Sequence, residues 1–273
     1  MRVRYSFSSR RTGHLKNIKK QRKRFPSITE KILNEADIII EVLDARFVKD
    51  TFNPEIDNFI KSKNKKIIHA INKSDLISLE NIEEMPDKSV LISCKDRRGI
   101  NELRNIIKIV SSQLKKEKII VGILGYPNTG KSSLINALIR RGSAPVSSQA
   151  GYTKSMQKLK LADSIFLLDS PGVIPRKEYS TTEGKKIAGH ARIGARTYSN
   201  VKDPEHAVVE LIGKYPGVLE AYYKIYSNGD SEILLEELGR QKNMLKKGNE
   251  VNADQVARLI LKEWQEGKIK INE

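Results

Sequence analysis

The chain has little of the chemistry that marks secreted or membrane-bound proteins. Cys94 is the only cysteine among 273 residues, so no intrachain disulfide can form, and this composition is typical of the reducing cytoplasm. No apolar run approaches the roughly 18 residues of a membrane-spanning helix. The N-terminus is charged but lacks the apolar segment of a signal peptide. We therefore expect a cytoplasmic protein with no membrane partner.

Acidic residues are also scarce, and their scarcity is uneven along the chain. Lys and Arg number 50 against 33 Asp and Glu, which gives a formal net charge of +17. Residues 1–24 contain ten basic residues and no acid, whereas residues 203–273 contain ten basic and thirteen acidic residues. Such an excess favours a polyanionic partner, nucleic acid before membrane. We predict that residues 1–25 form a basic arm that binds RNA phosphates.

Apolar runs alternate with helical patterns up to about residue 175. Strands are predicted at Ala36–Leu43, Lys66–Ile71, Ser89–Ser93, Ile119–Leu124, Lys158–Ala162 and Ser164–Leu168, and helices at Asn101–Leu114 and Ser132–Arg140. Continuous apolar runs are typical of buried parallel strands, and the alternating run at Lys158–Ala162 is typical of an edge strand. The order predicts a parallel α/β sheet with ligands at the carboxyl ends of its strands.

The strand pattern stops after this point and helical patterns follow. Helices are predicted at Glu205–Ile212, Gly217–Ile225, Ser231–Leu238 and Ala253–Gln265, with Asp203, Asp230 and Asn252 as N-caps, Gly239 and Gly267 as stops, and Leu261 and Trp264 in the core. The chain is therefore divided into a basic arm (1–25), an α/β domain (26–175), a linker (176–202) and an all-helical domain (203–273).

A phosphate-binding loop follows the fourth predicted strand. Residues 125–132 read GYPNTGKS, and the backbone N–H groups of such a loop converge on phosphate oxygens at a helix N-terminus. The candidate nucleotide-binding residues of this loop are Asn128, Thr129, Gly130, Lys131, Ser132 and Ser133. Lys131 would bridge the β- and γ-phosphates, and the Ser132 hydroxyl would bind Mg²⁺. The alternative is a chance glycine-rich turn.

Two later segments supply the remaining predicted contacts to Mg²⁺ and the γ-phosphate. Thr153 is the candidate second Mg²⁺ hydroxyl, although an ordinary loop threonine is the alternative. Asp169 would hold Mg²⁺ through water, and the N–H of Gly172 would sense the γ-phosphate. Val173 follows, where Ras-like enzymes place a water-orienting Gln, so slow intrinsic hydrolysis is expected.

A base-reading tetrapeptide ends the second predicted strand, at residues 72–75 (NKSD). The Asp75 carboxylate suits the guanine N1–H and exocyclic amine, whereas adenine offers no such pair of donors. Asn72 would tie this loop to the phosphate loop, and Lys73 would lie along the base. Residues 93–95 (Ser93, Cys94 and Lys95) would form the second base loop, with Cys94 as a buried thiol rather than a reactive one.

The order of these motifs identifies the architecture. The base-reading loops precede the phosphate loop, whereas an ordinary GTPase has the reverse order. The sequence therefore predicts a circularly permuted P-loop GTPase domain, followed by the all-helical domain, with GTP and GDP as ligands.

These motifs resemble the circularly permuted GTPases of ribosome assembly, the group that contains bacterial RbgA/YlqF and mitochondrial and nucleolar relatives. The resemblance extends over roughly residues 10–273 and adds residues 44–46 (DAR) and residues 260–269 (ILKEWQEGKI). It implies hydrolysis of GTP that is stimulated on the large ribosomal subunit, and binding of its rRNA. It also implies a K⁺ held by Asn128 and a catalytic role for His14, whose segment Thr12-Gly13-His14-Leu15 resembles a family motif. We expect a monomer away from the ribosome.

Two other functions remain open from the sequence. The first is an RNA-binding scaffold that GTP regulates without significant turnover. The second is a GTPase that acts on a non-ribosomal RNA or protein.

Overall fold

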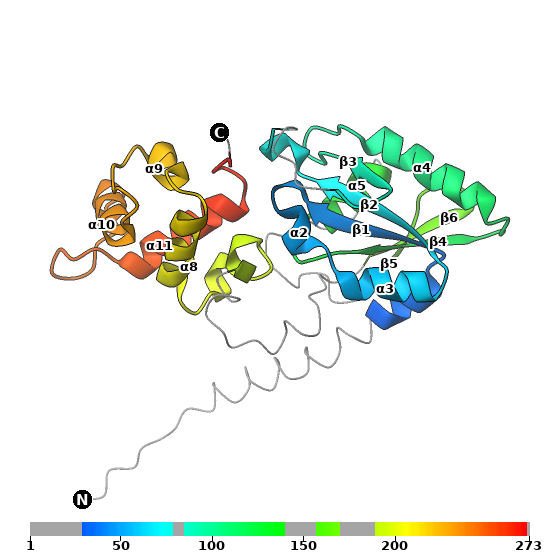
Figure 1. The fold of residues 1–273 in the computed structure, drawn as a ribbon, viewed down its shortest axis with the longest axis horizontal. Helices are drawn as coiled ribbons and strands as arrows, with labels where there is room; N and C mark the ends of the chain where they lie inside the picture. The colour runs from blue at the N-terminus through cyan, green and yellow to red at the C-terminus, as the bar shows by residue number, and fades with distance from the viewer. Residues whose placement is uncertain (1–28, 79–84, 140–156, 170–188, 272–273) are drawn as a thin grey trace, which may run out of the picture.

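The computed structural model describes residues 29–78, 85–139, 157–169 and 189–271. Six strands form one sheet in the order β3-β2-β1-β4-β6-β5 (Figure 1). Their bounds are β1 Ile38–Asp44, β2 Lys66–Asn72, β3 Ser89–Leu91, β4 Ile119–Leu124, β5 Gln157–Lys160 and β6 Ile165–Asp169. All neighbours are parallel except β5, which pairs antiparallel with β6 at the edge. This arrangement confirms the predicted α/β class and the edge strand.

The central strand β1 is buried along its whole length, which explains its continuous apolar sequence. It pairs with β2 on one side and β4 on the other, and its register places Asp44 opposite Asn72. The ends of the strands that carry the base-reading and phosphate loops therefore flank the end of β1.

Helices cover both faces of the sheet. On one face, α4 (Ile100–Gln113) and α5 (Lys131–Ile139) pack against the strands. On the other, α3 (Pro54–Ser62) and the helical residues 29–35 form a second apolar cluster. The short elements η1 (Ala45–Phe47), α2 (Val48–Thr51) and η2 (Ser74–Leu76) follow β1 and β2. The sequence did not predict α3.

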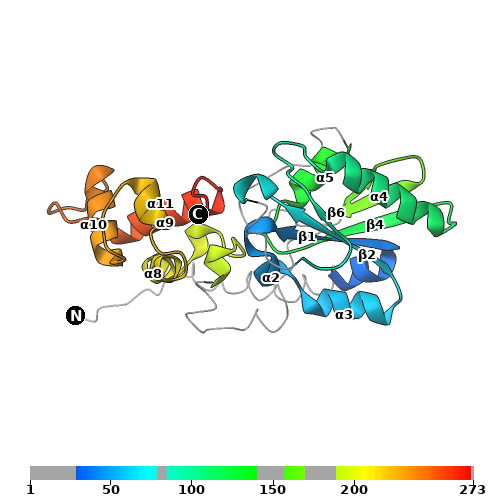
Figure 2. The same cartoon turned by 45° about the horizontal axis from the view of Figure 1, so that its top comes forward.

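The C-terminal helices lie beside the end of the sheet where β1 finishes (Figures 1 and 2). They are α8 Pro204–Lys214, α9 Val218–Tyr223, α10 Ser231–Gln241 and α11 Ala253–Gln265, preceded by η4 Tyr198–Asn200. Trp264 and Leu261 are fully buried in their shared core, as predicted. The side chains of Asp203, Asp230 and Asn252 cap α8, α10 and α11, which confirms the predicted caps.

One predicted helix end is wrong. α10 continues through Gly239 to Gln241, whereas Gly267 does follow the end of α11, with a φ of 73°. A Cβ on Gly239 would lie 2.2 Å from a methyl carbon of Val251. The glycine therefore allows close packing inside the helix instead of ending it. Among the described residues, no helix is long and apolar enough to cross a membrane.

Candidate nucleotide site

One buried side chain joins the three predicted loops. The Asn72 amide donates to the Thr129 carbonyl (2.9 Å), and its oxygen accepts from the Cys94 backbone N–H (3.1 Å). A Cβ on Gly130 would lie 2.2 Å from the Asn72 amide nitrogen, so this position requires glycine. The structure therefore brings the base-reading and phosphate loops together, although they are far apart in sequence.

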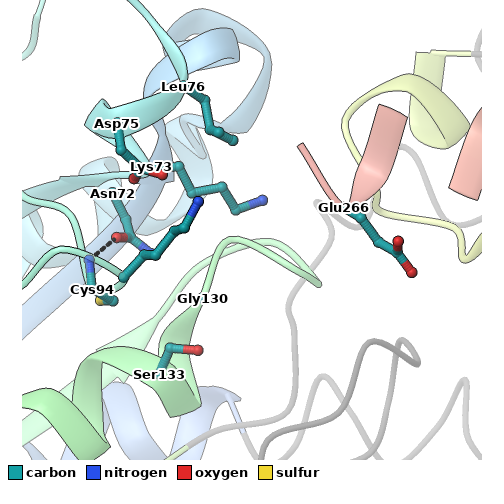
Figure 3. Close-up of a pocket in the computed structure, with 9 residues that line it drawn as sticks. Asn72, Lys73, Asp75, Leu76, Cys94, Gly130, Ser133 and Glu266 are labelled. Atoms are coloured by element: carbon teal, nitrogen blue, oxygen red, sulfur yellow. Dashed lines mark hydrogen bonds between the residues drawn. The ribbon is translucent and has the colours of Figure 1, made fainter. Parts of the chain in front are cut away.

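A cavity of about 280 Å³ lies between these loops (Figure 3). Its lining residues are Asn72, Lys73, Asp75, Leu76, Cys94, Lys95, Gly130, Ser133 and Glu266. The Ser93 hydroxyl donates to one Asp75 oxygen (2.7 Å) and fixes the carboxylate at the cavity. Burial raises the pKa of Cys94 to about 12, so its thiol is inert at neutral pH, as expected.

Lys73 lies at the cavity in a left-handed backbone conformation, with a φ of 65°. Its ammonium group donates to Asp44 (2.7 Å), whose carboxylate is completely buried at the end of β1. Arg46 binds both oxygens of the same carboxylate, at 3.0 and 2.8 Å. Although burial alone would raise the pKa of Asp44, Arg46 and Lys73 hold it well below its ordinary value. The ion pairs of Asp44 with Arg46 and Lys73 were not predicted from the sequence.

The phosphate loop connects β4 to α5 and depends on a glycine at its start. A Cβ on Gly125 would lie 2.4 Å from the Val42 carbonyl oxygen, and its φ is +144°. Lys131 begins α5, and its ammonium group donates to the Tyr126 carbonyl (2.5 Å). Burial lowers the pKa of Lys131 to about 8, although Asp169 opposes the shift. The loop therefore holds a partly desolvated cation close to a buried carboxylate.

The oxygen donors at this end fit the magnesium ion that the motifs imply. Ser132 follows Lys131 in the first turn of α5, and Asp169 is the buried last residue of β6. Hydroxyl and carboxylate oxygens suit Mg²⁺, which keeps several waters and takes further ligands from phosphates. Within the described ranges, no group of three or more His, Cys, Asp or Glu side chains could hold a metal ion. Thr153, Gly172 and His14 lie outside the described residues.

Two features that bring residues after 189 to this site were missed from the sequence. Asn128, in a left-handed conformation (φ 61°), donates through its amide to the Gly194 carbonyl at 2.9 Å. Glu266, at the end of α11, lines the cavity opposite Lys73 and Asp75 (Figure 3). No local pattern could reveal either feature, because each brings together segments that are distant in sequence.

The sheet with a phosphate loop and a paired base-reading loop defines a P-loop GTPase fold in permuted order. The structure of GNP-bound YlqF from T. maritima has this fold, with a TM-score of 0.61, 19% identity, and coverage of 89% of this chain and 94% of that one. A family model described as 50S ribosome-binding GTPase matches residues 120–222.

Sequence relatives agree with this fold. The uncharacterized GTP-binding protein MJ1464 of Methanocaldococcus jannaschii is 35% identical over 247 residues, covering 89% of this chain and 65% of that protein. Nucleolar GTP-binding protein 2 of Neurospora crassa is 31% identical over 263 residues, covering 92% of this chain and 42% of that protein. The chain thus spans less than two thirds of the length of either relative. By sequence and fold the chain is similar to the circularly permuted GTPases that include YlqF and nucleolar GTP-binding protein 2.

Proposed function

We propose that the protein binds and hydrolyses GTP as an assembly factor of the large ribosomal subunit or its precursor. The single observation that carries the proposal is the hydrogen bond from Asn72 to Thr129. This hydrogen bond holds the base-reading loop, with the Asp75 carboxylate that suits guanine, beside the phosphate loop. The match of residues 120–222 to the 50S ribosome-binding GTPase model and the net charge of +17 support a ribosomal RNA partner.

Each predicted residue has a role in this proposal. Asp75 reads the guanine edge, Lys73 and Asn72 border the base, and Ser93, Cys94 and Lys95 complete the second base loop. Thr129, Gly130 and Ser133 belong to the phosphate loop. Lys131 and Gly172 contact the β- and γ-phosphates. Mg²⁺ is bound by the hydroxyls of Ser132 and Thr153 and, through water, by Asp169. K⁺ is bound by Asn128, and His14 assists hydrolysis.

Turnover should be measured with and without purified large subunits, in K⁺ and in Na⁺ buffer. We expect a slow intrinsic rate, because Val173 offers no polar group to orient water, and an increase with subunits and K⁺. Lys131→Ala is the control for contaminating hydrolysis. Tight GTP binding without turnover on any particle would instead favour the RNA-binding scaffold.

The RNA partner requires a separate measurement. Crosslinking the protein with a nonhydrolysable GTP analogue, followed by sequencing of the bound RNA, should recover rRNA of the large subunit. Recovery of another RNA would replace the ribosomal substrate with a non-ribosomal one.

A further inference from the structure

The end of α11 is attached to the base-reading loop through a single arginine. Arg46 uses two of its side-chain N–H groups on Asp44, and its Nη1 donates to the backbone carbonyl of Trp264 at 2.9 Å. The Arg46 side chain is only 2% exposed. Asp44 in turn accepts from Lys73, which borders the guanine cavity. One continuous set of polar contacts thus joins the cavity to the last helix.

Apolar packing supports the same junction. The Phe47 and Trp264 rings are stacked at 6.2 Å, and the Arg46 guanidinium lies 4.9 Å from the centre of the Phe47 ring. A Cβ on Gly267 would lie 2.4 Å from a Leu76 methyl carbon, so α11 also ends directly against the residue after Asp75. Glu266, which directly precedes Gly267, lines the cavity itself.

Burial makes this junction sensitive to Lys73. Buried charges are stable only with well-placed partners, so a movement of Lys73 changes the balance of charge around Asp44. The hydrogen bonds between Asp44 and Arg46 then change, and Arg46 also donates to the Trp264 carbonyl. A guanine base that packs along Lys73 therefore acts on the end of α11 without any contribution from the γ-phosphate.

We propose that Arg46 is a positioning residue that couples occupancy of the guanine pocket to the placement of the C-terminal helices. The proposal rests on the guanine-binding function proposed above. In this proposal the placement of the helices responds to the base, and hence equally to GDP and GTP. Because coupling between two sites is reciprocal, docking of α11 also strengthens guanine binding.

Trp264 is the only tryptophan of the chain, so its fluorescence reports this junction in the intact protein. GDP, GTP, IDP and ADP should be titrated while Trp264 emission is followed, with affinities from calorimetry. We expect GDP and GTP to change the emission equally and ADP to leave it unchanged. Arg46→Ala should remove the emission change and weaken GDP and IDP by the same factor, roughly tenfold. Their ratio should persist, because Asp75 is intact.

Arg192→Ala is the matched control. Arg192 also crosses this interface, pairing with Asp50 at 3.0 Å and lying 5.2 Å from the Phe47 ring centre. Unlike Arg46, its side chain forms no hydrogen bond or ion pair with Asp44 or Lys73 within the described part of the chain. The Arg192→Ala variant should show the same emission change and the same nucleotide affinities as the unaltered protein. Arg46→Lys retains a charge beside Asp44 without the planar fork, and it should lose the emission change while folding normally.

The outcomes separate the two proposals. Failure of the unaltered protein to bind GDP would overturn the guanine function itself. Binding of GDP without an emission change would overturn the coupling alone. Equal behaviour of the Arg46 and Arg192 variants, or an emission change that survives in Arg46→Lys, would also overturn it.

Discussion

Asn72 at the end of β2 donates a hydrogen bond to the backbone carbonyl of Thr129 in the phosphate loop, 57 positions along the chain and 2.9 Å away. We predict that Asn72→Ala lowers the free energy of unfolding by about 1–3 kcal/mol, because the buried groups it leaves lose their partners. GDP affinity should fall as well. Denaturant unfolding and calorimetry measure both quantities. Asn58→Ala, on the exposed surface of α3, is the control and should change neither.

Asp75 should determine which base is bound. In Asp75→Asn the amide no longer suits the guanine amine but suits the carbonyl that xanthine has in its place. Loss of a charged hydrogen bond costs about 1.5–3 kcal/mol, so GTP should weaken while xanthosine triphosphate gains. Competition binding measures the exchange, with the exposed Asp96→Asn as control. Unchanged GTP affinity in Asp75→Asn would contradict the base site.

Nucleotide binding should become pH-dependent through Lys131. Burial lowers its pKa from 10.5 to about 8 in the free protein, whereas phosphate oxygens favour the charged form. Above about pH 8 the free protein has therefore lost a proton that the complex regains, so affinity should decline and binding should take up a proton. Calorimetry at pH 7 and pH 9, in buffers of different ionisation enthalpy, detects this uptake. Equal proton release at both values would contradict it.

The same shift has a consequence for the free protein. Between about pH 8 and 10.5 the unfolded chain keeps the Lys131 proton and the folded protein does not. The contribution of this group to the stability of the fold thus increases as pH rises through that window. In Lys131→Met this contribution should disappear.

Asn128 should connect potassium binding to the segment around Gly194. Its amide nitrogen is bound to Gly194, which directs the amide oxygen elsewhere and leaves it suited to a cation. Asn128→Gly keeps the left-handed backbone and removes the amide. We expect it to lose stimulation by K⁺ and to speed hydrogen exchange in residues 189–195. Asn228→Gly, at another left-handed position (φ 53°), is the control and should do neither.

Gly239 should resist substitution despite its position within a helix. Gly239→Ala gains roughly 1 kcal/mol of helix propensity, but its methyl group would overlap Val251, and overpacking costs about 1–3 kcal/mol. We expect a lower melting temperature. The second change Val251→Ala should restore part of it, which thermal unfolding of the single and double variants will test.

Local signals explain what the sequence predicted. A strand such as β1 is apolar because both of its faces are covered, and a phosphate loop needs glycine where backbone approaches backbone, as at Gly125. The signal for α3 was present in the Asn53 cap and Pro54, but it lay close to the turn after β1 and was missed. The predicted helix end at Gly239 was wrong because a glycine that ends a helix and a glycine that permits close packing look identical in sequence.

The junction between Arg46 and Trp264 shows the limit of such reasoning. The resemblance drew attention to residues 44–46, yet their role depends on a carbonyl that lies 218 positions away. Backbone carbonyls carry no sequence signature, and the geometry of a buried ion pair emerges only when the sheet and α11 are both folded. The same holds for Glu266 at the cavity.

The central position of β1 has a consequence for synthesis of the protein. β1 is made before the other strands of the sheet, and one of its two partners, β4, is made only after β2, β3 and α4. A nascent chain that has folded its first three strands therefore presents unpaired backbone N–H and C=O groups at the edge of β1 where β4 will pair, and such edges recruit other strands. Because the permuted order places the base-reading loop before the phosphate loop, the growing polypeptide is prone to aggregation until β4 is made.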